Sequence, residues 1–182
     1  MVPVDVETSL LTDGSKVTIR AITADDAPML QAFVRRLSAR SRRFRFFSAL
    51  VELSVAQLER LVTVDHGRAL ALVAVSERSE QTAIVAEARC VPDLAVCNAE
   101  FAIAVADEFQ RRGLGTQLMK RLFAYASRTG VRRLFGEILT DNKGMVSFVH
   151  RLGFRVRESG SDPSTLIASV LPPRRSLAFA KP

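Results

Sequence analysis

The chain has 182 residues, of which 48% are hydrophobic and 25% charged, and its formal net charge is +7. This length favours a single domain that can bury a core without a metal ion or a disulfide as a staple. No apolar run approaches the ~20 residues of a membrane span, the acidic N-terminus lacks the order of a signal peptide, and two cysteines make no disulfide framework. The sequence therefore predicts a cytoplasmic protein with no membrane partner.

The first half of the chain predicts one strand and two helices. The segment Lys16–Ile22 alternates and is rich in β-branched side chains, which is typical of a strand. Thr23 is expected to cap a helix over Asp25–Leu37, whose apolar residues recur on one face. After the basic segment SARSRRFRFF, Ser54 is expected to cap a second helix, VAQLERLV.

The second half begins with three strand-like runs joined by short turns, which predicts an antiparallel meander. These runs are Ala69–Val75, Ala83–Cys90 and Glu100–Val105. A helix over Gly113–Arg128 follows, and Gly130 is a suitable terminator for it. The remaining elements are expected to be a strand over Arg133–Leu139, a helix over Asn142–Leu152, a strand opened by Gly153 and Phe154, and a last strand over Thr165–Leu171.

The chain shows no internal repeat and no linker long enough to separate two domains. We therefore expect an N-terminal arm over 1–15, one domain over 16–171, and a loose C-terminal tail, rich in Pro and Arg, over 172–182.

The positive charge favours a polyanionic ligand, which could be nucleic acid, membrane headgroups or a phosphorylated small molecule. No nucleic-acid-binding motif is present, so no specific nucleic acid partner is expected.

The stretch QRRGLG (residues 110–115) stands where the long helix begins. It is neither a P-loop nor a dinucleotide fingerprint, whose third glycine is replaced by Leu118. It keeps the physics that both motifs share: glycines let backbone amides turn toward an anion, and a helix N-terminus offers unpaired N–H groups and partial positive charge. Arg111 and Arg112 add charge suited to phosphate. The alternative is a glycine-flanked helix start with solvated arginines.

This stretch resembles the acetyl-CoA-binding motif of the GNAT acyltransferase superfamily, Gln/Arg-x-x-Gly-x-Gly/Ala after the fourth strand. Gln110, Gly113 and Gly115 fall on the motif in register, and DNKGMVSFVHRLGF resembles the family's Asn-led helix that ends in Gly-Phe. The resemblance covers roughly 16–171 and is nearest to the bacterial protein-lysine acetyltransferase (Pat-like) domain. It implies an α+β fold, in which a central mixed, mostly antiparallel β-sheet is splayed at the CoA cleft and carries helices on both faces.

The resemblance also implies where acetyl-CoA, the co-substrate, would bind, and it implies no metal. The diphosphate would sit on the backbone amides of residues 111–116, and the pantetheine arm would lie along the strand before them, flanked by two residues of the Asn-led helix. The implied cofactor-binding residues are Ile103, Ala104, Val105, Gln110, Arg111, Arg112, Gly113, Leu114, Gly115, Thr116, Asn142 and Phe148.

Acetyl transfer to an amine calls for a base, because a lysine amine with a pKa near 10.4 is mostly protonated at neutral pH. Glu100 is the candidate catalytic residue, since several protein-acetylating members of the family carry a glutamate base at the start of this strand. Alternation of side chains along the strand would place Glu100 on the same face as Ala102 and Ala104, unless a β-bulge, which the family resemblance implies here, changes which residues share a face. The alternative is a strand-end carboxylate in solvent or paired with an arginine. Asp107 and Glu108 are expected to be turn residues.

Other chemistry-bearing side chains have weaker cases. Many relatives place a tyrosine, as general acid toward the thiolate, at a position that is Val149 here; His150 is its neighbour, but one residue rotates about 100° around a helix. Cys90 and Cys97 are expected to be buried small hydrophobic residues rather than carriers of an acyl intermediate. His66 is expected to be a turn residue or to border the acceptor cleft.

The acceptor stays open between a protein lysine and a small amine, because a fold does not dictate its substrate. A basic cluster is expected to be a solvated face or, alternatively, a docking surface for an acidic protein partner. Its members are Arg35, Arg36, Arg40, Arg42, Arg43 and Arg45. Two alternatives come from other functional classes. One is a non-catalytic module that senses acyl-CoA, and the other is a protein that binds nucleic acid through its positive charge. The protein is expected to be a monomer or a homodimer.

Overall fold

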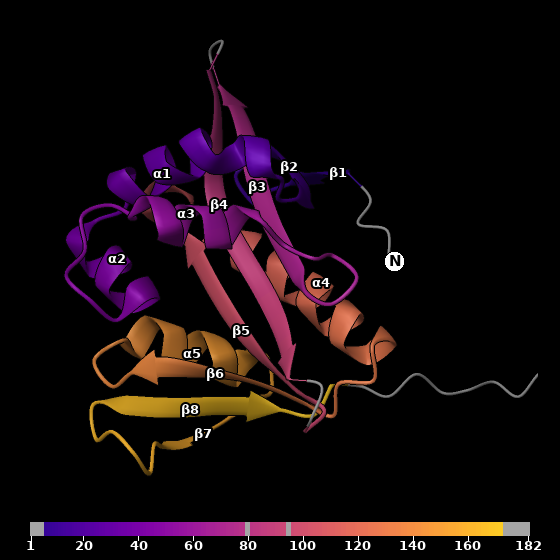
Figure 1. The fold of residues 1–182 in the computed structure, drawn as a ribbon, viewed down its shortest axis with the longest axis vertical. Coiled ribbons are helices and arrows are strands. Elements are labelled where there is room, and N and C mark those ends of the chain that lie inside the picture. The colour runs from indigo at the N-terminus through magenta and orange to yellow at the C-terminus, as the bar shows by residue number, and fades with distance from the viewer. Residues whose placement is uncertain (1–5, 79–80, 94–95, 173–182) are drawn as a thin grey trace, which may run out of the picture.

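The computed structural model describes residues 6–78, 81–93 and 96–172 and shows a mixed sheet with helices on both of its faces (Figure 1). The strands are β1 (Glu7–Leu10), β2 (Lys16–Ala21), β3 (Leu70–Arg78), β4 (Gln81–Asp93), β5 (Asn98–Val105), β6 (Arg133–Leu139), β7 (Arg155–Glu158) and β8 (Thr165–Val170). The helices are α1 (Ala27–Arg36), α2 (Ala39–Phe46), α3 (Val55–Val62), α4 (Leu114–Arg128) and α5 (Lys143–Arg151), with 3-10 turns at Ala24–Asp26 and Asp107–Phe109. Within the described ranges, no helix is both long and apolar enough to cross a membrane.

The eight strands follow the order β1-β2-β3-β4-β5-β6-β8-β7. Every neighbouring pair is antiparallel except β5 and β6, which are parallel and pair only from Asn98↔Arg133 to Glu100↔Phe135. Beyond Glu100 these two strands diverge (Figure 1). The predicted α+β class and the mixed, mostly antiparallel and splayed sheet are therefore confirmed.

The pairing of β4 with β5 assigns side chains to the two faces of the sheet. Ala88 pairs with Ile103, and Ile103 lies toward the start of α4, close to Gly115. The next pair along, Glu87 with Ala104, belongs to the opposite face because successive side chains alternate, and Glu87 there contacts α2. The face with α4 thus carries apolar residues such as Ala88 and Ile103, and the face with α2 carries charged residues such as Glu87 beside alanines such as Ala104.

The core lies where α4 packs on the centre of the sheet. The face of α4 that carries Leu118 and Leu122 is buried against β3, β4 and β5. Burial of each such leucine contributes about 2 kcal/mol relative to exposure. This packing holds the first turn of α4, and with it the preceding loop, in a fixed place at the end of β5.

Two elements were not predicted. Within the expected arm over 1–15, β1 pairs with β2, and the strand is only four residues long with one buried side chain, too short to show an alternating pattern. The basic segment after α1 forms α2, which buries none of its residues and so has no apolar stripe. Ser38 caps it by accepting a hydrogen bond from Ser41 N. The domain bounds 16–171 stay a prediction, and residues 173–182 of the expected tail lie outside the described ranges.

The bulge expected in the strand of Glu100 is absent, which is a correction. The register of β4 with β5 runs without a shift from Asp93↔Asn98 to Ala86↔Val105, whereas the shift in this part of the sheet lies in β3–β4, between Ala74 and Val75. Glu100 therefore keeps the unshifted parity and shares a face with Ala104.

Candidate active site

The divergence of β5 from β6 opens a groove of about 1200 Å³. Its floor is β5 from Glu100 to Val105, and α2 and α5 contribute to its walls. The groove runs from the point where β5 leaves β6, at Glu100, to the loop over residues 110–116 beyond the end of β5. One groove thus connects the candidate base with the glycine-containing loop.

The loop is shaped by two residues in the left-handed region. Arg111 has φ 60° and Gly113 has φ 85°, and Gly113 is the N-cap of α4. The first backbone N–H groups of an α-helix have no partner within the helix, and among the described residues no side chain caps those of α4. A Cβ at Gly115 would lie 3.4 Å from the ring of Phe148, so the start of α4 packs against α5 at this glycine. Uncapped amides at a helix N-terminus form a site suited to an anion.

The two arginines of the loop differ. Arg111 lines the groove, whereas the Arg112 side chain turns to the N-terminal segment, where its Nη1 lies 2.5 Å from Asp13 Oδ2. The Arg112 guanidinium also lies 5.3 Å from the centre of the Phe109 ring, and Thr12 N donates to the Arg112 carbonyl at 3.1 Å. The Arg112 charge is therefore already paired, and the segment after β1 braces the loop.

Most of the implied cofactor-binding residues meet in this groove. All of them line it except Arg112 and Leu114, and the Leu114 side chain is buried in the core. Gln110 Nε2 donates to the carbonyl of Val105 at 3.0 Å, which ties the loop to the end of β5. Asn142 caps α5, its Oδ1 accepting from Met145 N at 3.1 Å. Their part in binding acetyl-CoA stays a prediction.

Glu100 projects from the floor of the groove and makes no ion pair within 4 Å among the described residues. Partial burial raises the pKa of Glu100, the Glu137 carboxylate raises it further, and the Arg45 guanidinium opposes the shift. A raised pKa makes a carboxylate a stronger base near neutral pH.

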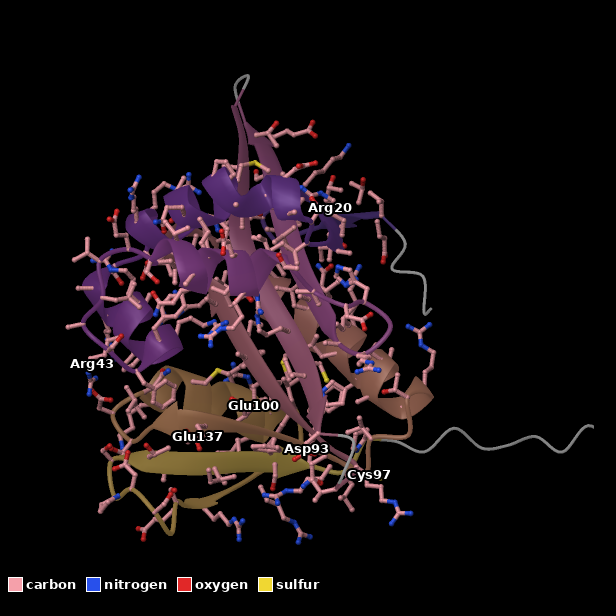
Figure 2. The ribbon with its side chains drawn as sticks, in the orientation of Figure 1. Arg20, Arg43, Asp93, Cys97, Glu100 and Glu137 are labelled. Atoms are coloured by element: carbon pink, nitrogen blue, oxygen red, sulfur yellow. The ribbon has the colours of Figure 1, made fainter. Side chains whose placement is uncertain are left out.

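Glu137 was missed by the sequence analysis. Phe135 pairs with Glu100, so Glu137, two residues further along β6, lies on the same face as Glu100 and also lines the groove (Figure 2). No sequence signal marks it, because its place beside Glu100 depends on the parallel register of two strands far apart in the chain.

Helix α2 is held over the groove by polar contacts at several points. Asp107, predicted as a turn residue, accepts hydrogen bonds from Ser38 N, Ser38 Oγ and Ser41 Oγ at 2.8–3.0 Å. Burial raises the pKa of Asp107, but these hydrogen bonds outweigh it and lower the pKa below its ordinary value. On the far side, Arg43 Nη1 lies 2.6 Å from Asp141 Oδ2 in the loop before α5.

The expected solvated basic face of the arginine cluster is confirmed for Arg35, Arg36, Arg40 and Arg43, which are exposed, whereas Arg42 and Arg45 are half-buried. Its side chains make tertiary contacts that the sequence pattern does not show: Arg35 with Glu52, Arg36 with the Ile84 carbonyl, Arg42 with the Leu50 carbonyl, Arg43 with Asp141, and Arg45 with Glu87. These contacts link α1 and α2 to β4, to the segment after α2 and to the loop before α5.

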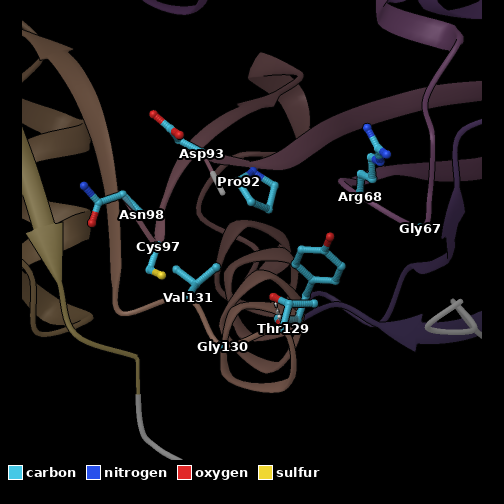
Figure 3. Close-up of a pocket in the computed structure, with 10 residues that line it drawn as sticks. Gly67, Arg68, Pro92, Asp93, Cys97, Asn98, Thr129, Gly130 and Val131 are labelled. Carbon is cyan, nitrogen blue, oxygen red and sulfur yellow. Dashed lines mark hydrogen bonds between the residues drawn. The ribbon is translucent and has the colours of Figure 1, made fainter. Parts of the chain in front are cut away.

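The remaining sequence candidates are buried or lie away from the groove. Val149 is fully buried, and His150 is exposed but does not line the groove. Burial raises the pKa of the Cys90 thiol to about 12. Cys97 is exposed, contrary to expectation, because it occupies the β4–β5 turn with φ 54°. It borders a second cavity of about 290 Å³ at the opposite end of β5 from the loop (Figure 3).

His66 does not border the groove. Its Nε2 lies 2.9 Å from the Ile22 carbonyl oxygen, within hydrogen-bond distance, which agrees with a turn residue that has a structural contact.

Comparisons with known proteins agree with this geometry. The model of the acetyltransferase (GNAT) family matches residues 33–154. An acetyltransferase of Pseudomonas aeruginosa is 31% identical over 157 residues, which cover 86% of this chain and 84% of that protein. The acetyltransferase Pat of Mycolicibacterium smegmatis is 35% identical over 111 residues, but these span only 33% of that protein and 60% of this chain. The crystal structure of the GNAT domain of S. lividans PAT superimposes with a TM-score of 0.82 at 26% identity, covering 91% of this chain and 96% of that one.

Proposed function

The chain belongs to the acetyltransferase (GNAT) family, whose members transfer acyl groups from acetyl-CoA, and from this premise we propose that it acetylates a primary amine, with Glu100 as the general base and a protein lysine as the acceptor. One observation carries the proposal: a single groove joins the amides at the start of α4 to the Glu100 carboxylate, which forms no ion pair with any described residue and lies where β5 leaves β6. The resemblance to protein-lysine acetyltransferase domains and the relative named Pat support the choice of lysine.

In this proposal the carrier lies along β5. The diphosphate binds the amides of residues 111–116, because they combine unpaired N–H groups with the positive end of the helix. Past Glu100, β5 no longer pairs with β6, so its backbone groups on that side are available to the pantetheine arm and to the thioester oxygen. Donors placed at a developing oxyanion lower the barrier to acyl transfer.

Glu100 addresses the protonation of the acceptor. Deprotonating a lysine ammonium at neutral pH costs roughly 4–5 kcal/mol, from a pKa near 10.4 at about 1.4 kcal/mol per unit. A base held beside the amine offsets part of this cost in the transition state, and its raised pKa suits the task. The usual tyrosine position is the buried Val149, so the thiolate leaves without that acid and takes its proton from the amine or from water.

The experiment measures release of CoA from acetyl-CoA by wild type with lysine-containing peptides, with small amines and with no acceptor. We expect acceptor-dependent release, and we expect Glu100→Gln to lower turnover by about 10²–10⁴-fold with little change in acetyl-CoA affinity. Glu108→Gln is the matched control, because Glu108 is exposed and does not line the groove. Binding of acetyl-CoA without release in any arm would favour a sensor module, and release with small amines alone would exclude the lysine.

A further inference from the structure

A buried ion-pair network lies beneath the groove, between α2 and β4. Glu87 is 3% exposed, and its Oε2 accepts from both Nε and Nη2 of Arg45 at 3.1 Å. Its Oε1 accepts from Arg89 Nε. Burial alone would raise the pKa of Glu87, but the positive charges of Arg45 and Arg89 lower it below its ordinary value. Glu87 is therefore a carboxylate at neutral pH, and it ties α2 to the sheet.

The network lies on the same face of the sheet as the candidate base. Glu87 pairs with Ala104 across β4–β5, and Ala104 shares the parity of Glu100. Arg45 lines the groove together with Glu100, yet among the described residues no ion pair within 4 Å joins the two. Arg45 is thus a cation near Glu100, but its guanidinium is directed to Glu87.

This arrangement matters because arginine binds carboxylates strongly. A guanidinium that is free to turn forms a bidentate pair with a nearby carboxylate, and such a pair lowers the carboxylate pKa by about 1–3 units. Paired in this way, Glu100 would be a poor base, and its oxygens would be occupied. In the structure, two nitrogens of Arg45 are instead engaged by Glu87.

We propose that Glu87 is a positioning residue that keeps Arg45 docked against the sheet, so that the Glu100 carboxylate stays unpaired and can accept the proton of the acceptor amine. The inference rests on the proposed function, in which Glu100 is the base. In that step the ammonium gives one proton to Glu100 and its nitrogen bonds to the thioester carbonyl carbon. The C–S bond then breaks with its electron pair on sulfur, and the second amine proton goes to this thiolate.

Other charged groups face the same space. Glu137 of β6 and Arg89 of β4 share the face of Glu100. The other charged groups that line the groove are Arg40 of α2, Arg60 of α3, Arg151 of α5, Asp107 and Arg111. All of them keep their side chains in the variants below, but Glu87→Gln also removes the partner of Arg89 Nε. Comparing Glu87→Gln in the wild-type and in the Arg45→Gln background therefore isolates the part of the pKa shift that depends on Arg45.

The test measures the Glu100 pKa directly, by carbon NMR titration of the full chain labelled at the glutamate carboxyl carbons. The Glu100 resonance is the one that Glu100→Gln removes. We expect Glu87→Gln to lower the Glu100 pKa by on the order of one unit and Arg45→Gln to raise it. Because Glu87 acts through Arg45, the double variant should resemble Arg45→Gln, whereas a double variant that returns to the wild-type pKa would indicate two independent charge effects and overturn the inference. Glu52→Gln, which breaks the exposed pair with Arg35, is the matched control and should leave the pKa unchanged.

A structural role alone would lower thermal stability without shifting the Glu100 pKa in opposite directions. A Glu100 pKa that is unchanged or raised in Glu87→Gln overturns the inference. If that variant does not fold, Glu87→Asp replaces it, since the shorter side chain weakens the hold on Arg45 and the expected sign is the same. The titration needs no acceptor amine, so an unchanged Glu100 pKa would overturn this inference and leave the proposed function standing. Failure of acetyl transfer by the wild-type protein would overturn the proposed function, but not the measured effect of Glu87 and Arg45 on the Glu100 pKa.

Discussion

Replacing Gly115 with aspartate or with asparagine separates the effect of a negative charge from the effect of side-chain volume at the proposed diphosphate site. Gly115 is the second residue of α4, and any side chain there brings a Cβ to 3.4 Å from the Phe148 ring. Aspartate and asparagine have nearly the same shape, so this steric effect is common to both. Only aspartate adds a negative charge where the diphosphate is proposed to bind.

The size of the effect follows from Coulomb's law. A carboxylate about 6 Å from a phosphate charge, at an effective dielectric constant of about 20, is repelled by roughly 3 kcal/mol. That energy corresponds to about a 100-fold weaker Kd for CoA in Gly115→Asp than in Gly115→Asn. An acidic residue in the first turn of a helix stabilises the helix by about 0.3–1 kcal/mol, so the aspartate variant should melt no lower than the asparagine variant.

Calorimetric titration with CoA and with pantetheine, together with thermal melts, checks this expectation. The two variants should differ for CoA and agree for pantetheine, which carries no phosphate. Equal CoA affinities for Gly115→Asp and Gly115→Asn would refute the assignment of the diphosphate to this helix start.

Two further predictions concern neighbouring positions. Gly136→Ala should destabilise the protein by about 1–3 kcal/mol, because its Cβ would lie 2.7 Å from a ring carbon of Phe101 and 2.9 Å from the Phe101 carbonyl oxygen. Its thermal midpoint should fall well below that of Gly160→Ala, where nothing lies within 4 Å; equal midpoints would contradict the clash. Arg111→Ala should weaken CoA binding about tenfold, because a charge-assisted hydrogen bond is lost. Arg112→Ala should weaken CoA binding clearly less, because Arg112 is already paired with Asp13. Equal losses of CoA affinity in the two variants, measured by a binding titration, would contradict the expectation that Arg111 contacts the diphosphate and Arg112 does not.

Local sequence was sufficient for the elements that carry their own signals. The long amphipathic helix after QRRGLG, the strand Arg133–Leu139 and the cap at Ser54 were predicted closely, because periodicity, β-branching and capping act within a few residues. The family and the splayed sheet were inferred from two short motifs in register.

The rest depends on contacts between segments far apart in the chain. Helix α2 has no apolar face to read, and Asp107, Asp141 and Glu87 hold it from other elements. The neighbourhood of Glu100 arises from a parallel register that brings up Glu137. Charges interact through space rather than along the chain, so the raised pKa of Glu100 follows from the tertiary structure, which buries its side chain in part and brings Glu137 and Arg45 near it.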